Sequence, residues 1–534
     1  MKDRARSYLR QDVVAEPLIN RWYATAYLVS PMTAPLMVAN GHLPTLRSFA
    51  SAPMVHVNAL KNPEMQGGAY IAYGTERVGE IEALIAETQQ VQAPLLAFAE
   101  AVKELDRVLA QEARGFSLEP LYAKVPGQLK GYVELTYDLQ CQPAMRFVEG
   151  LLYHSPVYQK QTQAIALSLY PGDQRPFVFS TPRLDSSDSL LVQTPFDSPA
   201  WDGLFGARLD PTDIEALADN LAVQPADRSR FASLFTQTPA PPRVDYAGDG
   251  VRVRYFGHAC VLLESATTSI LIDPQVSYPN PNGPDRFTFF DLPEKIDYVL
   301  FTHDHHDHVV FETLLPLRHL IRNVIVPKSG GAPADPSLKL MFRHLGFPVP
   351  RELDEMEVLD LADGAITALP FFGEHGDLNI RSKSAWHIRL RGRTFFLGAD
   401  SNNLDDELYA NIVRVIGPID AMFMGLECDG APQSWMYGPL AVRRMSRQMD
   451  QSRKLCSSDF AKCAGMIARL KPQHIYIYAM GREPWLSYIT SLDYSSDSKP
   501  ILEAGRLVDH CKQQGLDVED LYCKKEIHFE GIDQ

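Results

Sequence analysis

Six consecutive ionisable residues, His303 to His308, directly follow an apolar segment of the chain. They read His-Asp-His-His-Asp-His and so offer four imidazoles and two carboxylates. His303 and His305 can point to one side of an extended turn, whereas Asp307 and His308 belong to a second direction. Such groups bind transition metals, and two sets of them can hold two ions a few ångströms apart. The run therefore predicts a dinuclear metal centre with the ligands His303, His305, Asp307 and His308.

This motif resembles the signature of a known superfamily. HxHxDH at the end of a strand is typical of the metallo-β-lactamase fold, and the segment Phe256–Glu264 upstream of it is similar as well. The resemblance covers the chain from about Val251 to the C-terminus. It implies an αββα sandwich with a dinuclear site at one edge of its paired sheets, where Asp273 is buried and supports the metal loop.

The resemblance also directs attention to the remaining ligands. Hydrolytic members of the superfamily use a third histidine, a bridging aspartate and a last histidine. Asp400, at the tip of a predicted strand, fits the bridge, with helix capping as the alternative. At the third position Glu374 stands next to His375, and adjacent residues at a strand end point in different directions. Only one of the two is therefore expected to be a ligand.

The last histidine is missing from its expected place. The predicted strand His474–Tyr478 leads into Ala479, Met480 and Gly481, none of which binds a hard metal in that role. His474 lies at the opposite end of the strand, and five residues at about 3.3 Å each put it roughly 16 Å away, so we expect it to be structural. A shell that loses an imidazole and gains carboxylate favours redox-active iron over zinc.

The whole chain then resembles one group, the diiron β-hydroxylase of chloramphenicol biosynthesis and its relatives, in length, domain order and the segment Gly373–Asp377. The resemblance implies that Glu374 is an iron ligand, and that the cofactors are two iron ions with O2 as co-substrate. It implies β-hydroxylation of an aminoacyl thioester on the carrier domain of a nonribosomal peptide synthetase. An electron donor must be external, because no flavin or iron–sulfur motif is visible. The alternative is a zinc-dependent hydrolase of an ester, thioester or phosphodiester, which would need His375 as a ligand.

Three further features lie near the predicted edge. Glu427 follows an apolar run and is a candidate catalytic carboxylate, as a ligand or a gate for oxygen, with a surface acid as the alternative. The segment Trp435–Tyr437 could line a pocket for an aryl group, although aromatic core filling is the simpler interpretation. Arg482 could meet an anionic group of a carrier arm, but an ordinary surface arginine explains it as well.

The elements that position these residues follow from the hydrophobic pattern. Residues 251–534 alternate short apolar runs with helices, which predicts an α+β protein with an αββα sandwich. The predicted strands are 251–253, 261–263, 269–272, 298–301, 323–326, 366–369, 386–390, 394–397, 421–424 and 474–478, and the predicted helices are 311–317 and 460–470.

The segment 236–250 contains Pro239, Pro241 and Pro242 and predicts a semi-rigid linker. Before it, residues 1–235 predict a mixed α/β domain without a catalytic motif, which we expect to dimerise or dock. Its clearest element is a helix from Pro94 to Gly115, whose apolar stripe favours packing on its own core over a dimer seam.

Composition limits the class of protein. The 534 residues are 45% hydrophobic and 22% charged, which excludes a disordered or fibrous chain. The net charge of −15 opposes nucleic-acid binding. The uncharged stretch Trp22–Leu46 carries three prolines and predicts buried irregular structure rather than a membrane span. The first residues contain no apolar secretory core, and seven scattered cysteines without a CxxC pair suit reduced thiols in a cytoplasm. The resemblance to the diiron β-hydroxylases implies a homodimer formed by the N-terminal domain.

Overall fold

The computed structural model describes residues 6–243 and 245–532, and its C-terminal part is built on two seven-stranded sheets. In spatial order the first sheet contains β14 (Arg351–Leu353), β13 (Ile321–Pro327), β12 (Ile296–Leu300), β11 (Ser269–Ile272), β10 (Cys260–Glu264), β9 (Val251–Gly257) and β22 (Lys525–Phe529). The second contains β15 (Val358–Leu361), β16 (Gly364–Leu369), β17 (Ala385–Leu390), β18 (Arg393–Leu397), β19 (Ala421–Gly425), β20 (His474–Tyr478) and β21 (Asp517–Asp520).

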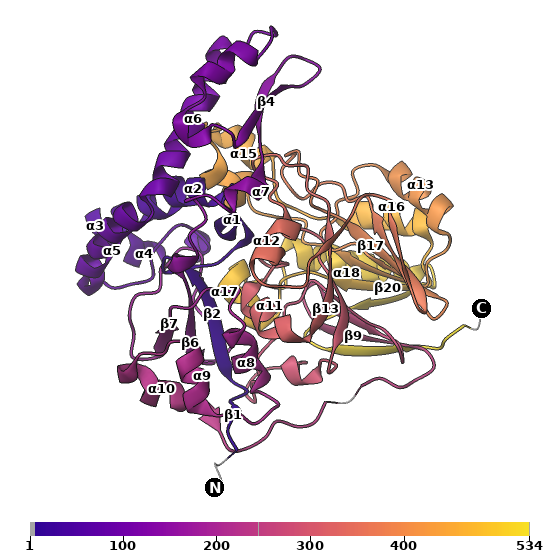
Figure 1. Ribbon diagram of the computed structural model, residues 1–534. Coiled ribbons are helices and arrows are strands. Elements are labelled where there is room, and N and C mark those ends of the chain that lie inside the picture. The colour runs from indigo at the N-terminus through magenta and orange to yellow at the C-terminus, as the bar shows by residue number, and fades with distance from the viewer. Residues whose placement is uncertain (1–5, 244, 533–534) are drawn as a thin grey trace.

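The two sheets pack face to face and share one apolar core, to which Val261, Ile272, Trp386 and Phe395 contribute fully buried side chains. Helices cover the outer faces, and those that follow β12 in the chain are α11 (Phe311–Leu317), α12 (Leu338–His344), α13 (Asp406–Ile416), α14 (Gln433–Tyr437), α15 (Arg447–Ser452), α16 (Phe460–Leu470), α17 (Ser487–Thr490) and α18 (Lys499–Gln513). The predicted αββα sandwich is therefore confirmed (Figure 1).

The N-terminal part is a mixed α/β structure, as predicted, with a four-stranded sheet in the order β3-β2-β6-β7. Its strands are β1 (Tyr8–Leu9), β2 (Val13–Ile19), β3 (Trp22–Tyr23), β4 (Val133–Tyr137), β5 (Pro143–Phe147), β6 (Gln163–Leu169), β7 (Ser189–Val192) and β8 (Phe235–Thr236). Its helices are α1 (Ala26–Val29), α2 (Ala34–Leu36), α3 (Leu43–Ser51), α4 (Pro53–Ala59), α5 (Val78–Val91), α6 (Ala93–Glu112), α7 (Glu149–Leu152), α8 (Ala200–Gly206), α9 (Ile214–Asn220) and α10 (Arg228–Ala232).

Two sequence interpretations for this part can be compared with the structure. The apolar stripe of α6 is buried in the core of the same chain, so core packing explains it. The stretch Trp22–Leu46 is not irregular: it forms β3, α1, α2, a π-helical turn at Met37–His42 and the start of α3. Pro35 and Pro44 are the second residues of α2 and α3, in the first turn, where a proline is tolerated because its missing N–H would have no partner in the helix.

The two parts of the chain are packed against each other over a common interior. One apolar cluster runs from Leu9 in β1 to Phe347 after α12. At this boundary the guanidinium of Arg175 lies 2.8 Å from Glu16 and 2.7 Å from Glu312, a buried bridge between β2 and α11. Within the described residues, no helix has the length and apolar character needed to cross a membrane.

Candidate metal centre

Parallel strands bring the predicted ligands to one edge of the sandwich. In the first sheet β9, β11, β12 and β13 run in one direction, and in the second sheet β16, β18, β19 and β20 do so. Loops at the carboxyl ends of these strands carry His258, Asp273, His303 to His308, Glu374, Asp400 and Glu427. The ligand run therefore meets residues that are distant in the sequence, such as Asp400, 92 positions after His308.

The loop after β12 is held by a buried carboxylate. Asp273 accepts hydrogen bonds from the Thr302 backbone N–H (2.7 Å) and hydroxyl (2.5 Å), and its Oδ2 lies 2.8 Å from His308 Nδ1. With Nδ1 engaged, the other nitrogen of His308 is directed at Asp400 Oδ2, 3.0 Å away. His303 repeats the pattern, because its Nδ1 is 3.0 Å from the Thr302 hydroxyl and its Nε2 points toward Asp400. Such supports fix which nitrogen can bind a metal.

His305 is oriented in the opposite sense. Its Nε2 lies 2.9 Å from the Tyr437 hydroxyl, and its Nδ1 lies 3.0 Å from Glu374 Oε1. The nitrogen of this ring that can bind a metal is therefore Nδ1, which lies next to the Glu374 carboxylate.

The ligand atoms form clusters in which all of them lie within 4.8 Å of one another. These clusters are His303 with His305 and Glu374, His303 with His308 and Asp400, His258 with Asp307 and His308, and Asp304 with His305 and His375. The first two share His303, and the second and third share His308. The clusters thus describe two adjacent positions for metal ions, and Asp400 lies in the cluster that connects them through His303 and His308.

The donor set fits a pair of cations. His303 Nε2, Glu374 Oε2 and Asp400 Oδ1 are buried atoms without a hydrogen-bond partner among the described residues. A buried polar atom left unpaired costs about 1–3 kcal/mol, so several in one place need a common partner. Three imidazoles with several carboxylates match the mixed nitrogen and oxygen shell of a non-haem iron site.

The carboxylate of Glu374 occupies its place because of local backbone geometry. Gly373 has φ +74°, and a Cβ there would lie 2.4 Å from the Cβ of Asn402, so only glycine fits the turn. Glu374 itself has φ +66°. Burial raises the pKa of its carboxyl to about 7, opposed by the nearby His305. His375 follows with Nδ1 3.2 Å from the Gly373 carbonyl. Its ring centroid lies 4.6 Å from that of His305, and it clusters with Asp304 and His305, but it does not belong to the cluster of His303, His305 and Glu374.

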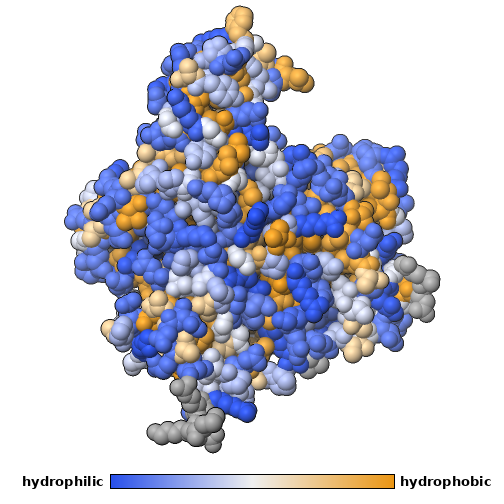
Figure 2. All heavy atoms as spheres, in the orientation of Figure 1, coloured by the Kyte–Doolittle hydropathy of each residue, from blue (hydrophilic) through white to orange (hydrophobic). Residues whose placement is uncertain are grey.

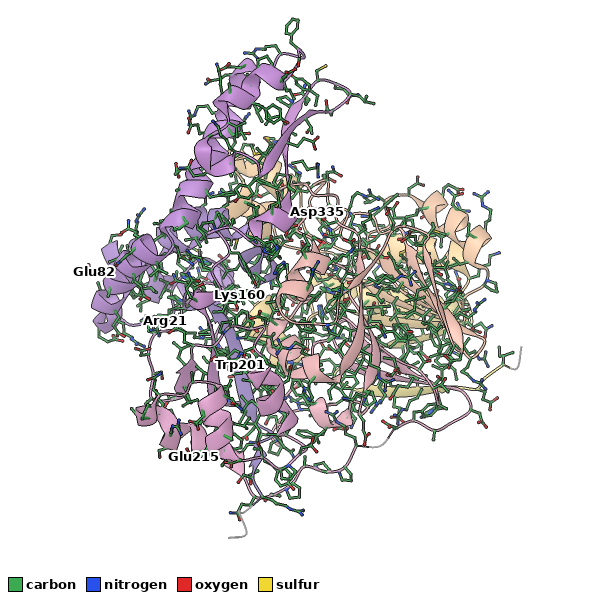
Figure 3. The ribbon with its side chains drawn as sticks, viewed as in Figure 1. Arg21, Glu82, Lys160, Trp201, Glu215 and Asp335 are labelled. Carbon is green, nitrogen blue, oxygen red and sulfur yellow. The ribbon has the colours of Figure 1, made fainter. Side chains whose placement is uncertain are left out.

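A second buried aspartate, Asp335, holds the loop between β16 and β17 that carries Glu374. Asp335, labelled in Figure 3, accepts hydrogen bonds from the backbone N–H groups of Gly330 (2.6 Å), Ser382 (3.0 Å) and Arg381 (3.2 Å). Just beyond, Ser384 N–H donates to the Thr302 carbonyl at 2.7 Å, which ties the loop of Glu374 to the loop of the histidines.

A cavity of about 350 Å³ opens onto this centre. Its walls include Glu374, Asp400, Glu427 and Trp435. Glu427 is partly buried and accepts a long 3.4 Å hydrogen bond from Tyr494. Burial, together with the charges of Glu374 and Asp400, raises the pKa of Glu427 well above its usual range. It therefore lies beside the ligand clusters but in none of them.

His258 is a residue that the sequence interpretation overlooked. It follows β9, and its Nε2 is 3.3 Å from Asp307 Oδ2, while Nδ1 has no hydrogen-bond partner among the described residues. The signal was present, because a histidine at the end of a buried strand next to β10 leads to the same edge as the HxHxDH run. The positions after β20 offer no such group: Ala479, Met480 and Gly481 line the cavity.

Of the other residues that the sequence analysis singled out, some lie near the ligand clusters and some lie far from them. Within α14, Trp435 and Met436 line the cavity, and Tyr437 lies next to His305. The segment thus forms part of a pocket wall, the alternative to core filling. Arg482 instead pairs with Asp520 away from the ligand clusters. His474, also distant, pairs with Asp517 at 2.6 Å.

Comparisons with known proteins cover both parts of the chain. Residues 8–239 match the family described as the diiron non-heme β-hydroxylase N-terminal domain, and residues 268–455 match the β-lactamase superfamily domain. The chain is 38% identical over 532 residues, 98% of its length and 100% of the relative, to 4-amino-L-phenylalanyl-[CmlP-peptidyl-carrier-protein] 3-hydroxylase of Streptomyces venezuelae.

Solved structures and shorter relatives add to this. The crystal structure of CmlA, a diiron β-hydroxylase from Streptomyces venezuelae, matches with a TM-score of 0.93 at 38% identity, over 98% of this chain and 100% of that one. A UPF0173 metal-dependent hydrolase of Pyrobaculum arsenaticum is 32% identical over 92 residues, 17% of this chain and 34% of that protein.

Proposed function

Because this chain belongs to the family of diiron non-haem β-hydroxylases, we propose that it hydroxylates the β-carbon of an aminoacyl group held as a thioester on the carrier domain of a nonribosomal peptide synthetase. Enzymes of this family are monooxygenases with two iron ions and O2 as co-substrate. The relative from Streptomyces venezuelae acts on 4-amino-L-phenylalanine attached to a peptidyl carrier protein, which supports a carrier-bound substrate here.

One observation carries the assignment of the iron ligands. Glu374 lies with His303 and His305 in one cluster, and among the described residues that line the cavity after β20 there is no histidine. One iron would be held by these three residues, and the second by Asp307 and His308, with Asp400 between the two. The ions supply the activation of oxygen when they are bound. A hydrolytic zinc pair would need His375 in place of Glu374, and His375 clusters with Asp304 and His305 but not with His303.

The protein's own groups have three tasks in this reaction. The paired sheets and α14 bury the histidines and carboxylates and limit the access of water. Asp273, Thr302 and Tyr437 fix the ring orientations. Glu427, next to the ligands in the cavity, is proposed to be the catalytic carboxylate that gates the access of oxygen, since burial among other carboxylates raises its pKa and favours the form that carries a proton.

The experiment compares one amino acid in two forms. 4-Amino-L-phenylalanine is offered free and loaded on a carrier domain, with reductant and O2, to enzyme of measured iron content. We expect hydroxylation of the loaded form, loss of it in His303→Ala, and about two irons per chain. Equal turnover of the free amino acid, or thioester hydrolysis without hydroxylation, would contradict the proposal. The electron donor is proposed to be a separate protein.

The homodimer predicted from the sequence is proposed to form through the projecting lobe of the N-terminal part. Figure 2 shows hydrophobic side chains at its tip. Phe116 is 81% exposed and Leu139 is 97% exposed, and their loops are joined by the hydrogen bond from Gly115 N–H to the Tyr137 hydroxyl (3.0 Å). Phe116→Asp with Leu139→Asp should give monomers in sedimentation, whereas Leu502→Asp on α18 should not.

A cytoplasmic location is proposed as well. All seven cysteines are free, although Cys141 is exposed and Cys456 is half-buried. Free thiols are typical of a reducing compartment. Titration of the thiols of the unfolded protein, isolated from the cell of origin, tests this. Fewer than seven free thiols would indicate disulfides and therefore an oxidising compartment.

A further inference from the structure

Three neighbouring cavities lie along the boundary between the two parts of the chain. The first is the cavity of about 350 Å³ at the metal centre. A second cavity, of about 590 Å³, shares the wall residues Gly67, His306, Trp435 and Met436 with the first. A third, of about 690 Å³, shares Asn40, Pro44, Ser434 and Gly438 with the second. The cavities therefore follow one another from the metal centre to the outside of α14 and α15.

The second cavity is aromatic and carries no acidic or basic side chain of the Asp, Glu, Lys or Arg types among its described lining residues. Trp22, Tyr27 and Phe177 are among its rings, and burial lowers the pKa of His42 to about 3, so that ring is neutral. Neutral polar groups stand between the rings, including Thr45 and Ser434. Such walls accept an uncharged chain with amide groups and exclude an ion.

A π-helical turn shapes this second cavity. Met37–His42 form it, and Asn40, Gly41 and His42 all line the cavity. Asn40 Nδ2 donates to the Pro439 carbonyl at 2.8 Å, which joins the turn to the loop after α14. π-Helical turns cost stability and are frequent at functional sites. The turn is thus a second, independent sign that this cavity binds something.

The third cavity is basic. Lys103 from α6, Arg444 and the first residue of α15, Arg447, line it, and Asp450 is the one acid among the described lining residues. Lys103 also pairs with the exposed Glu100 outside the lining, at 2.8 Å. The carboxylate of Asp450 is already engaged by the backbone N–H and the hydroxyl of Ser434, at 2.8 Å and 2.6 Å. In a chain with a net charge of −15, three cations around one cavity mark a place for an anion. Figure 1 shows α15 next to α6 at the base of the projecting lobe.

We propose that the phosphopantetheine arm of the carrier passes through the third and second cavities, with its phosphate held by Lys103, Arg444 and Arg447. This rests on the proposed function. The order of the walls, basic then neutral and aromatic then metal-binding, repeats the order of groups in the arm, which are a phosphodiester, two amides and a thioester. A free amino acid lacks the neutral middle section and would present two charges to the aromatic walls.

The first test uses small probes and needs no turnover. Binding of 4′-phosphopantetheine and of pantetheine to the iron-loaded enzyme is measured by calorimetry. We expect phosphopantetheine to bind at least tenfold tighter, and Arg444→Glu with Arg447→Glu to abolish that difference while pantetheine binding stays the same. Arg351→Glu with Arg414→Glu, two exposed arginines elsewhere, changes the net charge equally and should keep the difference. A difference that survives in the first double variant would overturn the phosphate site.

The second test fills the neutral cavity. Thr45 on α3 lines it, whereas Arg47, on the same helix, is exposed and is not part of the lining. Thr45→Trp should lower hydroxylation of the carrier-bound substrate more than tenfold with iron content and optical spectrum unchanged, and Arg47→Trp should leave all three unchanged. Full activity of Thr45→Trp would refute the path. Absence of hydroxylation in the wild-type enzyme would instead refute the proposed function, so the two failures are distinguishable.

Discussion

The hydroxyl of Tyr27 in α1 donates a hydrogen bond of 2.9 Å to Asp304, the residue that separates His303 from His305. The same hydroxyl lies 3.3 Å from the Tyr437 hydroxyl, which in turn lies 2.9 Å from His305 Nε2. All of these groups are buried. A helix of the N-terminal part therefore takes part in orienting a predicted metal ligand in the C-terminal part.

Removal of the Tyr27 hydroxyl should weaken the metal centre. Tyr27→Phe removes the hydrogen bond to Asp304 Oδ1, and Oδ2 of this buried carboxylate already lacks a partner among the described residues. The loss should cost about 1–3 kcal/mol of stability and should leave the ring of His305 less firmly oriented. Loss of such a support typically lowers metal affinity about 10–100-fold. Iron content after dialysis against a chelator measures this. Tyr23→Phe is the control, because the Tyr23 hydroxyl donates a hydrogen bond of 3.0 Å to Glu312, which is not one of the predicted ligands. Equal iron loss in both variants would contradict the interpretation.

Glu374 and His375 are predicted to respond differently to replacement. Glu374→Ala removes a carboxylate from the cluster with His303 and His305 and should strip iron from the site. His375→Ala removes a ring outside that cluster and should leave most iron bound. Metal analysis and the optical spectrum of each purified variant decide between them, and the reverse result would return His375 to the ligand set and favour zinc hydrolysis.

His258 is predicted to support the second metal position. In His258→Asn the 3.3 Å contact with Asp307 is lost, so one of the two metals should bind about 10–100-fold more weakly while the other stays. A titration of the apoprotein with Fe²⁺ should then show one tight and one weak step per chain. His474→Asn, at the far end of β20, provides the comparison, and two tight steps in both variants would assign His258 a packing role only.

The stability of the domain boundary should fall as the pH rises toward neutrality. Glu149 accepts hydrogen bonds from Ser30 (2.8 Å) and from the Ser337 backbone N–H (2.9 Å), and burial raises its pKa from 4.5 to about 7. The folded state therefore holds a proton between pH 4.5 and 7 that the unfolded state has released. The free energy of unfolding should decrease across this window by up to about 3 kcal/mol, and below pH 4.5 the contribution is constant.

Glu149→Gln should remove this dependence, since an amide keeps the neutral form at every pH. Thermal midpoints between pH 4.5 and 8 measure the slope in both proteins. Glu100→Gln, an exposed acid on α6, should keep the wild-type slope. A slope unchanged by Glu149→Gln would mean that the carboxyl is already ionised in the folded state.

Much of the sandwich could be predicted because its strands are buried on both faces and read as continuous apolar runs. The predicted 269–272 and 474–478 coincide with β11 and β20, and the predicted helix 311–317 coincides with α11. Edge strands such as β15 and β21 were not predicted, because alternating polar residues and short length leave little signal.

The candidate site was predictable where it is local and not where it depends on the fold. The HxHxDH run and the strand-end acids at Glu374, Asp400 and Glu427 are visible in the sequence, and the structure brings them to one edge. The role of His258 depends on its contact with Asp307, and that of Tyr27 on its contact with Asp304, 277 positions away in the sequence. No local sequence pattern predicts such contacts. Whether Glu374 is the ligand stays a prediction that the geometry supports.

The common interior of the two parts has a consequence for a protease-nicked chain. The described residues of 237–250 form no helix or strand, which makes this segment a natural place for cleavage. Because the apolar cluster from Leu9 to Phe347 and the bridge of Arg175 with Glu16 and Glu312 cross the boundary, the two fragments would stay together as a non-covalent complementation pair. The unbroken peptide is then needed to bring the halves together during folding, and afterwards it is dispensable.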